Sequence, residues 1–244
     1  MNSENKVALV TGGARRLGKY ISLTLAEAGY DIVLNYNESS KILLEDTIKQ
    51  ISDFNVNVTA VKCDVTKISE IRKMFAAVNL KYRRLDLLVN NAAVFKRTEF
   101  LETTEKIYDG FLDTNLKGVF FCCQEAAKIM LKSDNKVSRI INIASLGAVE
   151  NWTGFIPYSL AKAGVVKLTR QLGKKLAPDI LVNAIAPGTV EMEDDENTDI
   201  GDSGKYPMKR FAVPEDITSL VKYLATENNY ITGRIFVVDG GKSL

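Results

Sequence analysis

The chain has 244 residues, of which 46% are hydrophobic and 25% charged, and its formal net charge is +2. A chain of this length buries a full hydrophobic core without a disulfide or metal staple. Its charges are spread over both halves, which argues against a nucleic-acid partner because such a surface needs a basic stripe. The chain has no histidine, which excludes serine–histidine and cysteine–histidine catalysis and removes the commonest metal ligand. We therefore expect no metal site.

The cysteine pattern and the apolar runs indicate where the protein works. Cys122 and Cys123 are adjacent and Cys63 is left over, so the pattern does not suggest a disulfide framework. A reduced, cytoplasmic protein is expected. No apolar run approaches the roughly 18 residues of a membrane span, so we expect no membrane partner. The N-terminus does not resemble a signal peptide, because the short run Val7–Val10 leads directly into a glycine turn.

Short apolar runs alternate with helix-length amphipathic stretches along the chain. The runs do not alternate in polarity, which is typical of strands covered on both faces. The expected strands are Val7–Val10, Asp31–Asn35, Val56–Val61, Leu85–Val89, Arg139–Ala144, Leu181–Ala186 and Ile235–Val238. The expected helices are 16–28, 40–52, 68–81, 105–132, 157–176 and 214–226. This alternation predicts an α/β protein: a single-domain Rossmann fold over residues 1–244, with a doubly wound, mostly parallel seven-stranded sheet and helices on both faces.

One segment, about residues 188–212, is too long for an ordinary connection. It is rich in acids, with Glu191, Glu193, Asp194, Asp195 and Glu196. Long loops in compact domains are usually lids or disordered tails. Because this one lies between a strand and a helix, we expect a mobile lid.

The first predicted strand runs into Thr11-Gly12-Gly13-Ala14-Arg15-Arg16-Leu17-Gly18, and a helix follows. Such a turn brings backbone N–H groups close to a pyrophosphate, while the helix N-terminus supplies positive potential. A tight turn without a ligand is the simpler alternative. The adjacent arginines favour a ligand, because a cation near a helix N-terminus is disfavoured unless an anion compensates for it.

The end of the second strand indicates which nicotinamide cofactor binds. A site for NAD usually places an acid there to hold the ribose 2′-hydroxyl. Here the strand ends Leu34-Asn35-Tyr36-Asn37, with no acid before Glu38. Asn35 is expected to donate to a 2′-phosphate and Arg15 to pair with it. The pattern favours NADP(H).

Tyr158 and Lys162 stand four residues apart in a predicted helix and therefore share one face. A nearby ammonium favours the phenolate form of tyrosine, so Tyr158 could protonate a developing alkoxide. Taken alone, such a pair is more often a surface pair. Its neighbours argue otherwise, because Asn90-Asn91, Ser145 and Pro187-Gly188 end other strands at the edge of the sheet where open α/β folds bind ligands.

These features occur in one order: the glycine turn, Asp64-Val65, Asn90-Asn91-Ala92, Asn115, Ser145, Tyr158 with Lys162, Pro187-Gly188, Ile231-Thr232-Gly233 and Val238-Asp239-Gly240-Gly241. In this order they resemble the short-chain dehydrogenase/reductase family over nearly the whole chain. The general likeness is nearest to 3-oxoacyl-thioester reductases. Arg16, where the family usually has a middle glycine, is similar to pteridine reductases. Those enzymes tend to carry an acid where this chain has Ser145, and Ala93 replaces the glycine usual after Asn-Asn-Ala.

The resemblance implies the catalytic roles. Tyr158 would be the general acid, with Lys162 binding the nicotinamide ribose and lowering the tyrosine pKa. Ser145 would hydrogen-bond the substrate carbonyl, and Asn115 would carry a water linking Lys162 to solvent. More simply, Asn115 could cap or kink a helix and Ser145 could end a strand.

The resemblance also implies a cofactor site. Asp64 would accept from the adenine amino group beside Val65, Asn91 and Ala92 would line the adenosine side, and the backbone of 187–190 would hold the nicotinamide amide. The full expected set is Gly12, Arg15, Arg16, Leu17, Gly18, Asn35, Tyr36, Asp64, Val65, Asn91, Ala92, Ala93, Tyr158, Lys162, Pro187, Gly188 and Val190.

The expected reaction is NADP(H)-dependent reduction of a carbonyl to an alcohol. One candidate substrate is a 3-oxoacyl thioester. If it is carried by an acidic carrier protein, docking needs a basic rim, whereas the lid is acidic. Lys128 and Lys132 could contribute to such a rim. A pterin, a small ketone or a sugar-derived carbonyl stays open. A non-catalytic NADP-sensing regulator is the alternative of a different class. The resemblance also implies a homotetramer or homodimer, paired through helices 105–132 and 157–176 and the last strand.

Overall fold

The computed structural model describes residues 5–133, 137–192 and 202–244. Within these ranges seven strands form one parallel sheet in the order β3-β2-β1-β4-β5-β6-β7. The strands are β1 (Val7–Val10), β2 (Asp31–Tyr36), β3 (Val58–Lys62), β4 (Leu87–Asn90), β5 (Ser138–Ile143), β6 (Ile180–Pro187) and β7 (Ile235–Val238). The predicted Rossmann fold is confirmed, and each strand lies within two residues of its expected start.

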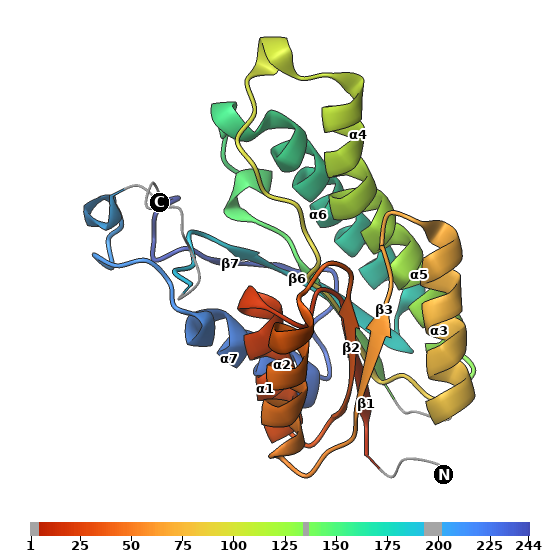
Figure 1. Ribbon diagram of the computed structural model, residues 1–244. Helices are drawn as coiled ribbons and strands as arrows, with labels where there is room; N and C mark the ends of the chain where they lie inside the picture. The colour runs from red at the N-terminus through yellow and green to blue at the C-terminus, as the bar shows by residue number, and fades with distance from the viewer. Residues whose placement is uncertain (1–4, 134–136, 193–201) are drawn as a thin grey trace.

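Helices cover both faces of the sheet (Figure 1). One face carries α1 (Arg16–Glu27), α2 (Lys41–Ser52) and α7 (Pro214–Thr226). The other carries α3 (Ile68–Tyr82), α5 (Val119–Met130) and α6 (Ile156–Leu176), with α4 (Glu105–Leu112) leading into α5. Among the described residues, no helix combines the length and the apolar character needed to cross a bilayer.

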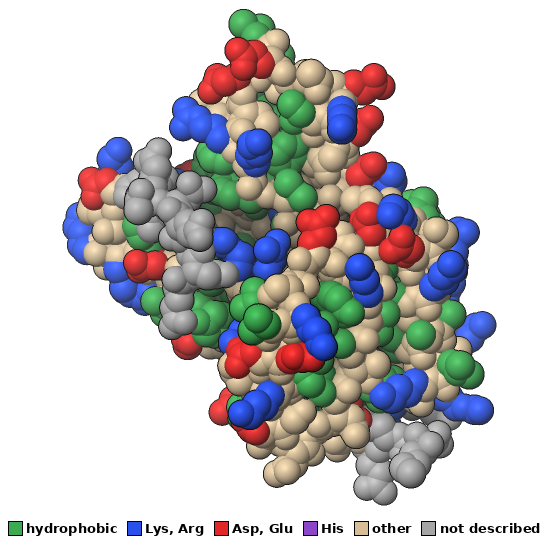
Figure 2. Space-filling model, in the orientation of Figure 1, with side chains coloured by type: hydrophobic (Ala, Val, Ile, Leu, Met, Phe, Trp, Pro, Cys, Tyr) green, Lys and Arg blue, Asp and Glu red, His purple; other side chains and the backbone are tan. Residues whose placement is uncertain are grey.

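The topology opens a crevice at the carboxyl edge of the sheet. The chain leaves β1 towards β2 on one side, whereas β4 leads to β5 on the other, so the connections diverge between β1 and β4. Figure 2 shows a hollow in the middle of this face, with hydrophobic side chains along its upper side and Lys or Arg side chains along its lower side. The carboxyl ends of the parallel strands on both sides of this divergence therefore lie at one edge, around one opening.

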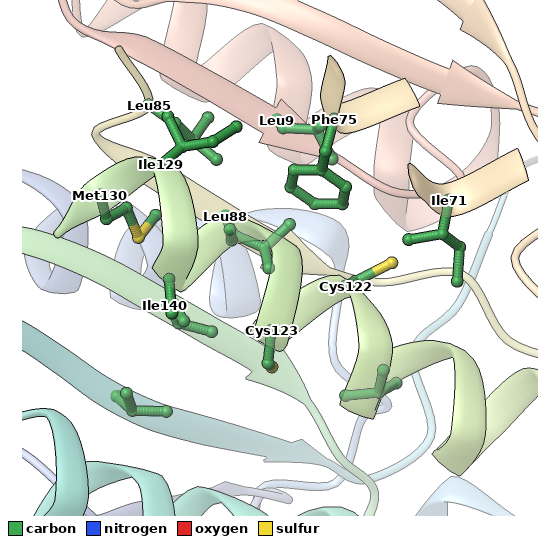
Figure 3. Close-up of a cluster of buried hydrophobic side chains, with 14 of the residues drawn as sticks. Leu9, Ile71, Phe75, Leu85, Leu88, Cys122, Cys123, Ile129, Met130 and Ile140 are labelled. Atoms are coloured by element: carbon green, nitrogen blue, oxygen red, sulfur yellow. The ribbon is translucent and has the colours of Figure 1, made fainter. Parts of the chain in front are cut away.

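The core consists of two layers, one on each side of the sheet. Side chains alternate along a strand, so Leu9 points into the layer under α3 and α5, whereas Ala8 and Val10 point into the layer under α1 and α7. Figure 3 shows the first layer, in which Cys122 and Cys123 pack among aliphatic side chains. Burial raises the pKa of the Cys123 thiol to about 12. The strands are apolar on both faces because both faces are covered, which explains their unalternating sequences.

The predicted helix 105–132 is interrupted. A π-helical turn at Asp113–Gly118 separates α4 from α5 and contains Asn115. A π turn inserts one extra residue, which a search for helical periodicity does not detect. The turn also brings Gly118 against the backbone of Val65, where an added Cβ would lie 2.7 Å from the Val65 carbonyl oxygen.

The expected lid is only partly within the described residues. Its two ends are joined by a parallel bridge between Val190 and Ala212 and by a 2.8 Å hydrogen bond between the hydroxyls of Thr189 and Tyr206. Four of the five acids that characterise it in the sequence, Glu193, Asp194, Asp195 and Glu196, lie outside the described residues.

Candidate functional site

The glycine turn packs directly against the helix that follows it. Gly12 has a φ of +61°, in the left-handed region that side chains disfavour. A Cβ on Gly18 would overlap the carbonyl oxygen of Gly12 and lie 2.6 Å from the amide nitrogen of Asn91. The turn can therefore lie this close to α1 only because Gly18 has no side chain.

Gly18→Ala is expected to destabilise the protein by about 2–3 kcal/mol, because the new methyl group meets backbone that cannot move without opening the turn. The melting temperature should fall by roughly 5–10 °C for a chain of this size. Gly110→Ala is the matched control: Gly110 is also helical, but an added Cβ there meets nothing within 4 Å. A melting temperature as high in the Gly18 variant as in the Gly110 variant would contradict the proposed close contact.

Asn35 is part of the turn's framework. It is 2% exposed, its Oδ1 accepts from the Gly12 N–H at 3.2 Å, and its Nδ2 donates to the Cys63 carbonyl at 3.0 Å. Further contacts at 3.3 and 3.4 Å join the same nitrogen to the carbonyls of Tyr36 and Val61. The expectation that Asn35 donates to a 2′-phosphate is therefore wrong in this structure, because its amide hydrogens are used by main-chain carbonyls.

Asn91 ties β4 to the same turn. Its Nδ2 donates to the carbonyls of Thr11 and Gly12 at 3.0 and 3.2 Å, while the Thr11 hydroxyl accepts from the N–H groups of Asn91 and Ala92. Asn91 and Ala92 are partly exposed and Ala93 is exposed. The structure thus places these residues beside the glycine turn, as a cofactor site requires.

Arg15 and Arg16 are exposed at the start of α1, next to the partly buried Leu17. Arg16 has a φ of +50°, in the left-handed region that glycine adopts more readily than arginine. Glycine is the residue that the family usually has at this position. Together with the close approach of Gly12 and Gly18, this gives a narrow backbone cradle with two cations at its rim. The chemistry of this cradle fits an anionic dinucleotide.

The other expected cofactor residues surround the same opening. Asp64 follows β3; burial tends to raise its pKa, but hydrogen bonds from Thr66 and Lys67 outweigh burial and lower it. Gly188 follows β6 and packs against Asp239, and its N–H donates to the Val238 carbonyl at 2.9 Å. The remaining expected residues on this edge are Tyr36, Val65, Pro187 and Val190, which are all buried or partly buried.

Ser145, Tyr158 and Lys162 meet across the opening. Ser145 follows β5, and the other two lie one turn apart in α6, with the Lys162 Nζ 5.8 Å from the centre of the Tyr158 ring. The exposed fractions are 4%, 8% and 2%. The Ser145 Oγ accepts from the Gly147 N–H at 3.1 Å, which leaves its own hydrogen available to donate.

Burial shifts the pKa values of Tyr158 and Lys162 in opposite directions. Burial raises the pKa of the Tyr158 phenol, and a hydrogen bond from Ser145 offsets only part of that rise. Burial also lowers the pKa of Lys162 from 10.5 to about 8, and its ammonium donates to the Ile143 carbonyl at 2.7 Å. The net direction for the Tyr158 pKa is therefore upward and set by burial, and the expected lowering by Lys162 stays a prediction.

Asn115 is fully buried in the π-helical turn. Its Nδ2 donates to the Val94 carbonyl at 3.0 Å, and its Oδ1 accepts from the Val94 N–H at 3.2 Å. The side chain thus holds the segment after β4 in place. A water relay at Asn115 would have to use its main-chain groups, at a turn where the regular helical hydrogen-bond pattern is broken.

Three aromatic residues near Tyr158 were not among the expected site residues. Phe95 follows β4, and Trp152 and Phe155 precede α6; the three rings contact one another, and Phe95 also contacts the ring of Tyr158. Two of them stand three and six residues before Tyr158, and Trp152 is the chain's single tryptophan. That concentration of aromatic residues near the tyrosine was a usable signal.

Comparison with known proteins agrees with this geometry. A family model described as "Enoyl-(Acyl carrier protein) reductase" matches residues 12–243. The chain is 36% identical to a 3-oxoacyl-[acyl-carrier-protein] reductase of Synechocystis, over 97% of this chain and 96% of that protein. The chain belongs to the short-chain dehydrogenase/reductase family.

Other members of the family are similarly close. The chain is 38% identical to the 3-oxoacyl-[acyl-carrier-protein] reductase FabG of Staphylococcus epidermidis, over 97% of this chain and 98% of that protein. A short-chain dehydrogenase/reductase structure from Serratia marcescens superposes with a TM-score of 0.91 at 31% identity, covering 98% of each chain. An acetoin dehydrogenase structure from Enterobacter cloacae gives 0.87 at 30% identity, covering 98% of this chain and 96% of that one. The chain is therefore an oxidoreductase of this family.

Proposed function

We propose that this protein is an NADPH-dependent reductase that converts a carbonyl to an alcohol. The observation that carries this proposal is the convergence of Ser145, Tyr158 and Lys162, each at most 8% exposed, at the carboxyl edge of the sheet. A neutral phenol is a proton donor, which is what reduction of a carbonyl needs. The family membership supports the reaction class.

Each of the three side chains has a distinct task. The nicotinamide, when bound, supplies the hydride. Ser145 donates its hydroxyl hydrogen to the carbonyl oxygen and holds that oxygen beside the phenol. Tyr158 transfers its proton to that oxygen as negative charge develops there. Lys162 uses one of its three hydrogens on Ile143, so two remain to hold ribose hydroxyls, and its charge stabilises the phenolate left behind.

The two arginines at the start of α1 are proposed to select the phosphorylated cofactor. They are exposed beside the glycine turn, whereas Asn35 is not available to a phosphate. A charge-assisted hydrogen bond from a guanidinium to a phosphate is among the stronger contacts that an exposed side chain makes. We therefore assign the preference for NADPH to Arg15 and Arg16 and not to Asn35.

Arg16→Gly is expected to raise the KM for NADPH by about tenfold, the loss of roughly 1.4 kcal/mol, and to leave the KM for NADH unchanged. Glycine adopts the φ of +50° without strain, so the backbone of the turn should keep its shape. Arg83→Gly is the matched control, since Arg83 ends α3 with a φ of 55° far from the turn. Steady-state kinetics with both cofactors checks this; equal increases for NADPH and NADH would contradict it.

Two substrate classes follow from the names of similar proteins. The relatives named 3-oxoacyl-[acyl-carrier-protein] reductase suggest a 3-oxoacyl thioester, and the acetoin dehydrogenase structure suggests a small ketone. The decisive experiment is NADPH oxidation, followed at 340 nm, with acetoacetyl thioesters, vicinal diketones and pterins. Consumption of NADPH with at least one carbonyl is the expected result, and no consumption with any of them would count against a reductase.

We also propose that the protein assembles through α4, α5 and α6. Large apolar side chains are exposed on these helices, with Tyr108, Phe120 and Leu160 exposed at 42%, 44% and 53%. Light scattering after gel filtration should give a dimer or tetramer of the 27.0 kDa chain. Phe120→Lys should lower that mass because it buries a charge in the contact. A wild-type particle of 27.0 kDa would refute assembly.

A further inference from the structure

Three aromatic side chains form one side of the opening next to Tyr158. We call Phe95, Trp152 and Phe155 the aromatic wall. Phe95 comes from the segment after β4 and the other two from the segment between β5 and α6, and these two segments run side by side (Figure 1). A 2.9 Å hydrogen bond from the Thr98 N–H to the Gly154 carbonyl joins their backbones. The wall is therefore part of a connected surface.

Phe95 is exposed beside the reacting group. Its ring stacks on Phe155, with centroids 4.6 Å apart and planes within 2°, and it meets Tyr158 edge-on at 4.9 Å. Yet 58% of Phe95 is exposed. Phe155 covers one face of the ring, so the exposure belongs to the rest of the residue. An exposed phenylalanine of this kind is unfavourable in water and favourable against a ligand.

Trp152 is held in place on several sides. Its Nε1 donates to Glu150 at 2.7 Å, and its ring lies against Gly147, where an added Cβ would be 2.7 Å from Trp152. Lys242, near the C-terminus, pairs with Glu150 at 3.3 Å and lies 5.3 Å from the centre of the indole. A wall fixed in this way loses little freedom when a ligand binds.

From this arrangement we infer that the aromatic wall selects substrates that carry a flat, conjugated ring next to the carbonyl group. This inference rests on the proposed reductase function and narrows its substrate. A carbonyl that accepts the Tyr158 proton has its substituent beside Phe95, since the two rings are in contact. A planar ring there packs on the exposed part of Phe95, stacked or edge to face, the arrangements that aromatic rings prefer. A flexible acyl chain gains no such stacking.

A matched pair of ketones separates ring stacking from simple apolar contact. 1-Phenylpropane-1,2-dione and 1-cyclohexylpropane-1,2-dione have the same reactive diketone and six-carbon rings, but only the first ring is flat. For wild type we expect the KM of the phenyl compound to be about fivefold lower, within the range of one aromatic contact. In Phe95→Leu, which keeps an apolar side chain but removes the ring, the two values should differ by less than about twofold.

The preference of each protein is the ratio of its KM values for the two ketones. Dividing the wild-type preference by that of the variant cancels the different intrinsic reactivity of the two ketones. Phe54→Leu is the control, because Phe54 is also exposed but follows α2 at the opposite edge of the sheet. It should keep the wild-type preference. An unchanged preference in Phe95→Leu, or an equal loss for both ketones, would overturn the inference while leaving the reductase function intact.

Binding measured without turnover distinguishes failure of the wall from failure of the proposed function. Ligand-observed saturation-transfer NMR, with NADP⁺ present, gives the affinity of each diketone directly. Preference for the phenyl compound that disappears in Phe95→Leu supports the wall even if neither diketone is reduced. Equal affinities of wild type for both compounds overturn it, whatever the turnover.

Discussion

Tyr158→Phe is expected to lower the turnover number by about a thousandfold, because removing a general acid typically costs a factor of 10²–10⁴. Phenylalanine keeps the ring that packs against Phe95 and removes only the hydroxyl that carries the proton. Since Tyr158 is 8% exposed and burial already keeps its phenol neutral, the change removes no charge from the folded protein. The KM for NADPH should stay within about twofold, because the lost group acts mainly in the transition state.

Tyr30→Phe is the matched control for this experiment. Tyr30 is also buried, and its hydroxyl donates to the Ala225 carbonyl at 2.8 Å, but it lies at the far edge of the sheet. That variant should lose about 1–2 kcal/mol of stability and keep full turnover. If Tyr158→Phe left turnover unchanged, Tyr158 would not be the acid. If wild type bound NADPH and reduced nothing, the NADP-sensing alternative would gain support.

Lys162→Met is expected to have two effects of opposite sign. Turnover should fall at least about a hundredfold, because the charge that stabilises the phenolate is removed. Stability at pH 7 should rise by about 1 kcal/mol. The fall of the Lys162 pKa from 10.5 to about 8 means that burying its charge costs about 3 kcal/mol. The Ile143 carbonyl also loses its hydrogen-bond partner in this variant, which costs about 1–2 kcal/mol of stability. The net change is the small stabilisation given above.

The pH dependence gives the sharper test of this variant. Between about pH 8 and pH 10.5 the unfolded chain binds a proton at Lys162 that the folded chain has released, so wild-type stability rises with pH in that window. The free-energy cost of burying the charged Lys162 is fully present below about pH 8. The stability advantage of Lys162→Met should therefore be largest near pH 7 and shrink towards pH 10.5. Denaturant unfolding at several pH values checks this, and a constant difference would contradict it.

Much of the fold was predictable because its signals are local. The strands are apolar on both faces, so runs such as Val7–Val10 and Leu85–Val89 stand out without any knowledge of their neighbours. The helix starts and the glycine turn are equally local. The π-helical turn was not predictable, because a single extra residue disturbs the 3.6-residue pattern less than ordinary variation in side chains does.

The sequence predicted which residues meet at the candidate site better than it predicted their hydrogen bonds and pKa values. Ser145, Tyr158 and Lys162 do converge, as their places at strand ends and on one helix face predicted. The role of Asn35 was wrong because its partners Gly12 and Cys63 come from two other segments. The rise of the Tyr158 pKa could not be predicted from the sequence, because it comes from burial, which depends on every element around the opening.

The sequence by itself determined the order of the elements, the parallel sheet, the glycine turn and the membership of the short-chain dehydrogenase/reductase family, since each depends on short stretches of chain. Only the tertiary structure decided which polar groups are free to act. It showed that Asn35 and Asn115 serve the backbone, and that Phe95 lies against Phe155, sixty positions further along the chain. A side chain's exposure and its hydrogen-bond partners depend on residues that the fold, not the chain order, brings together.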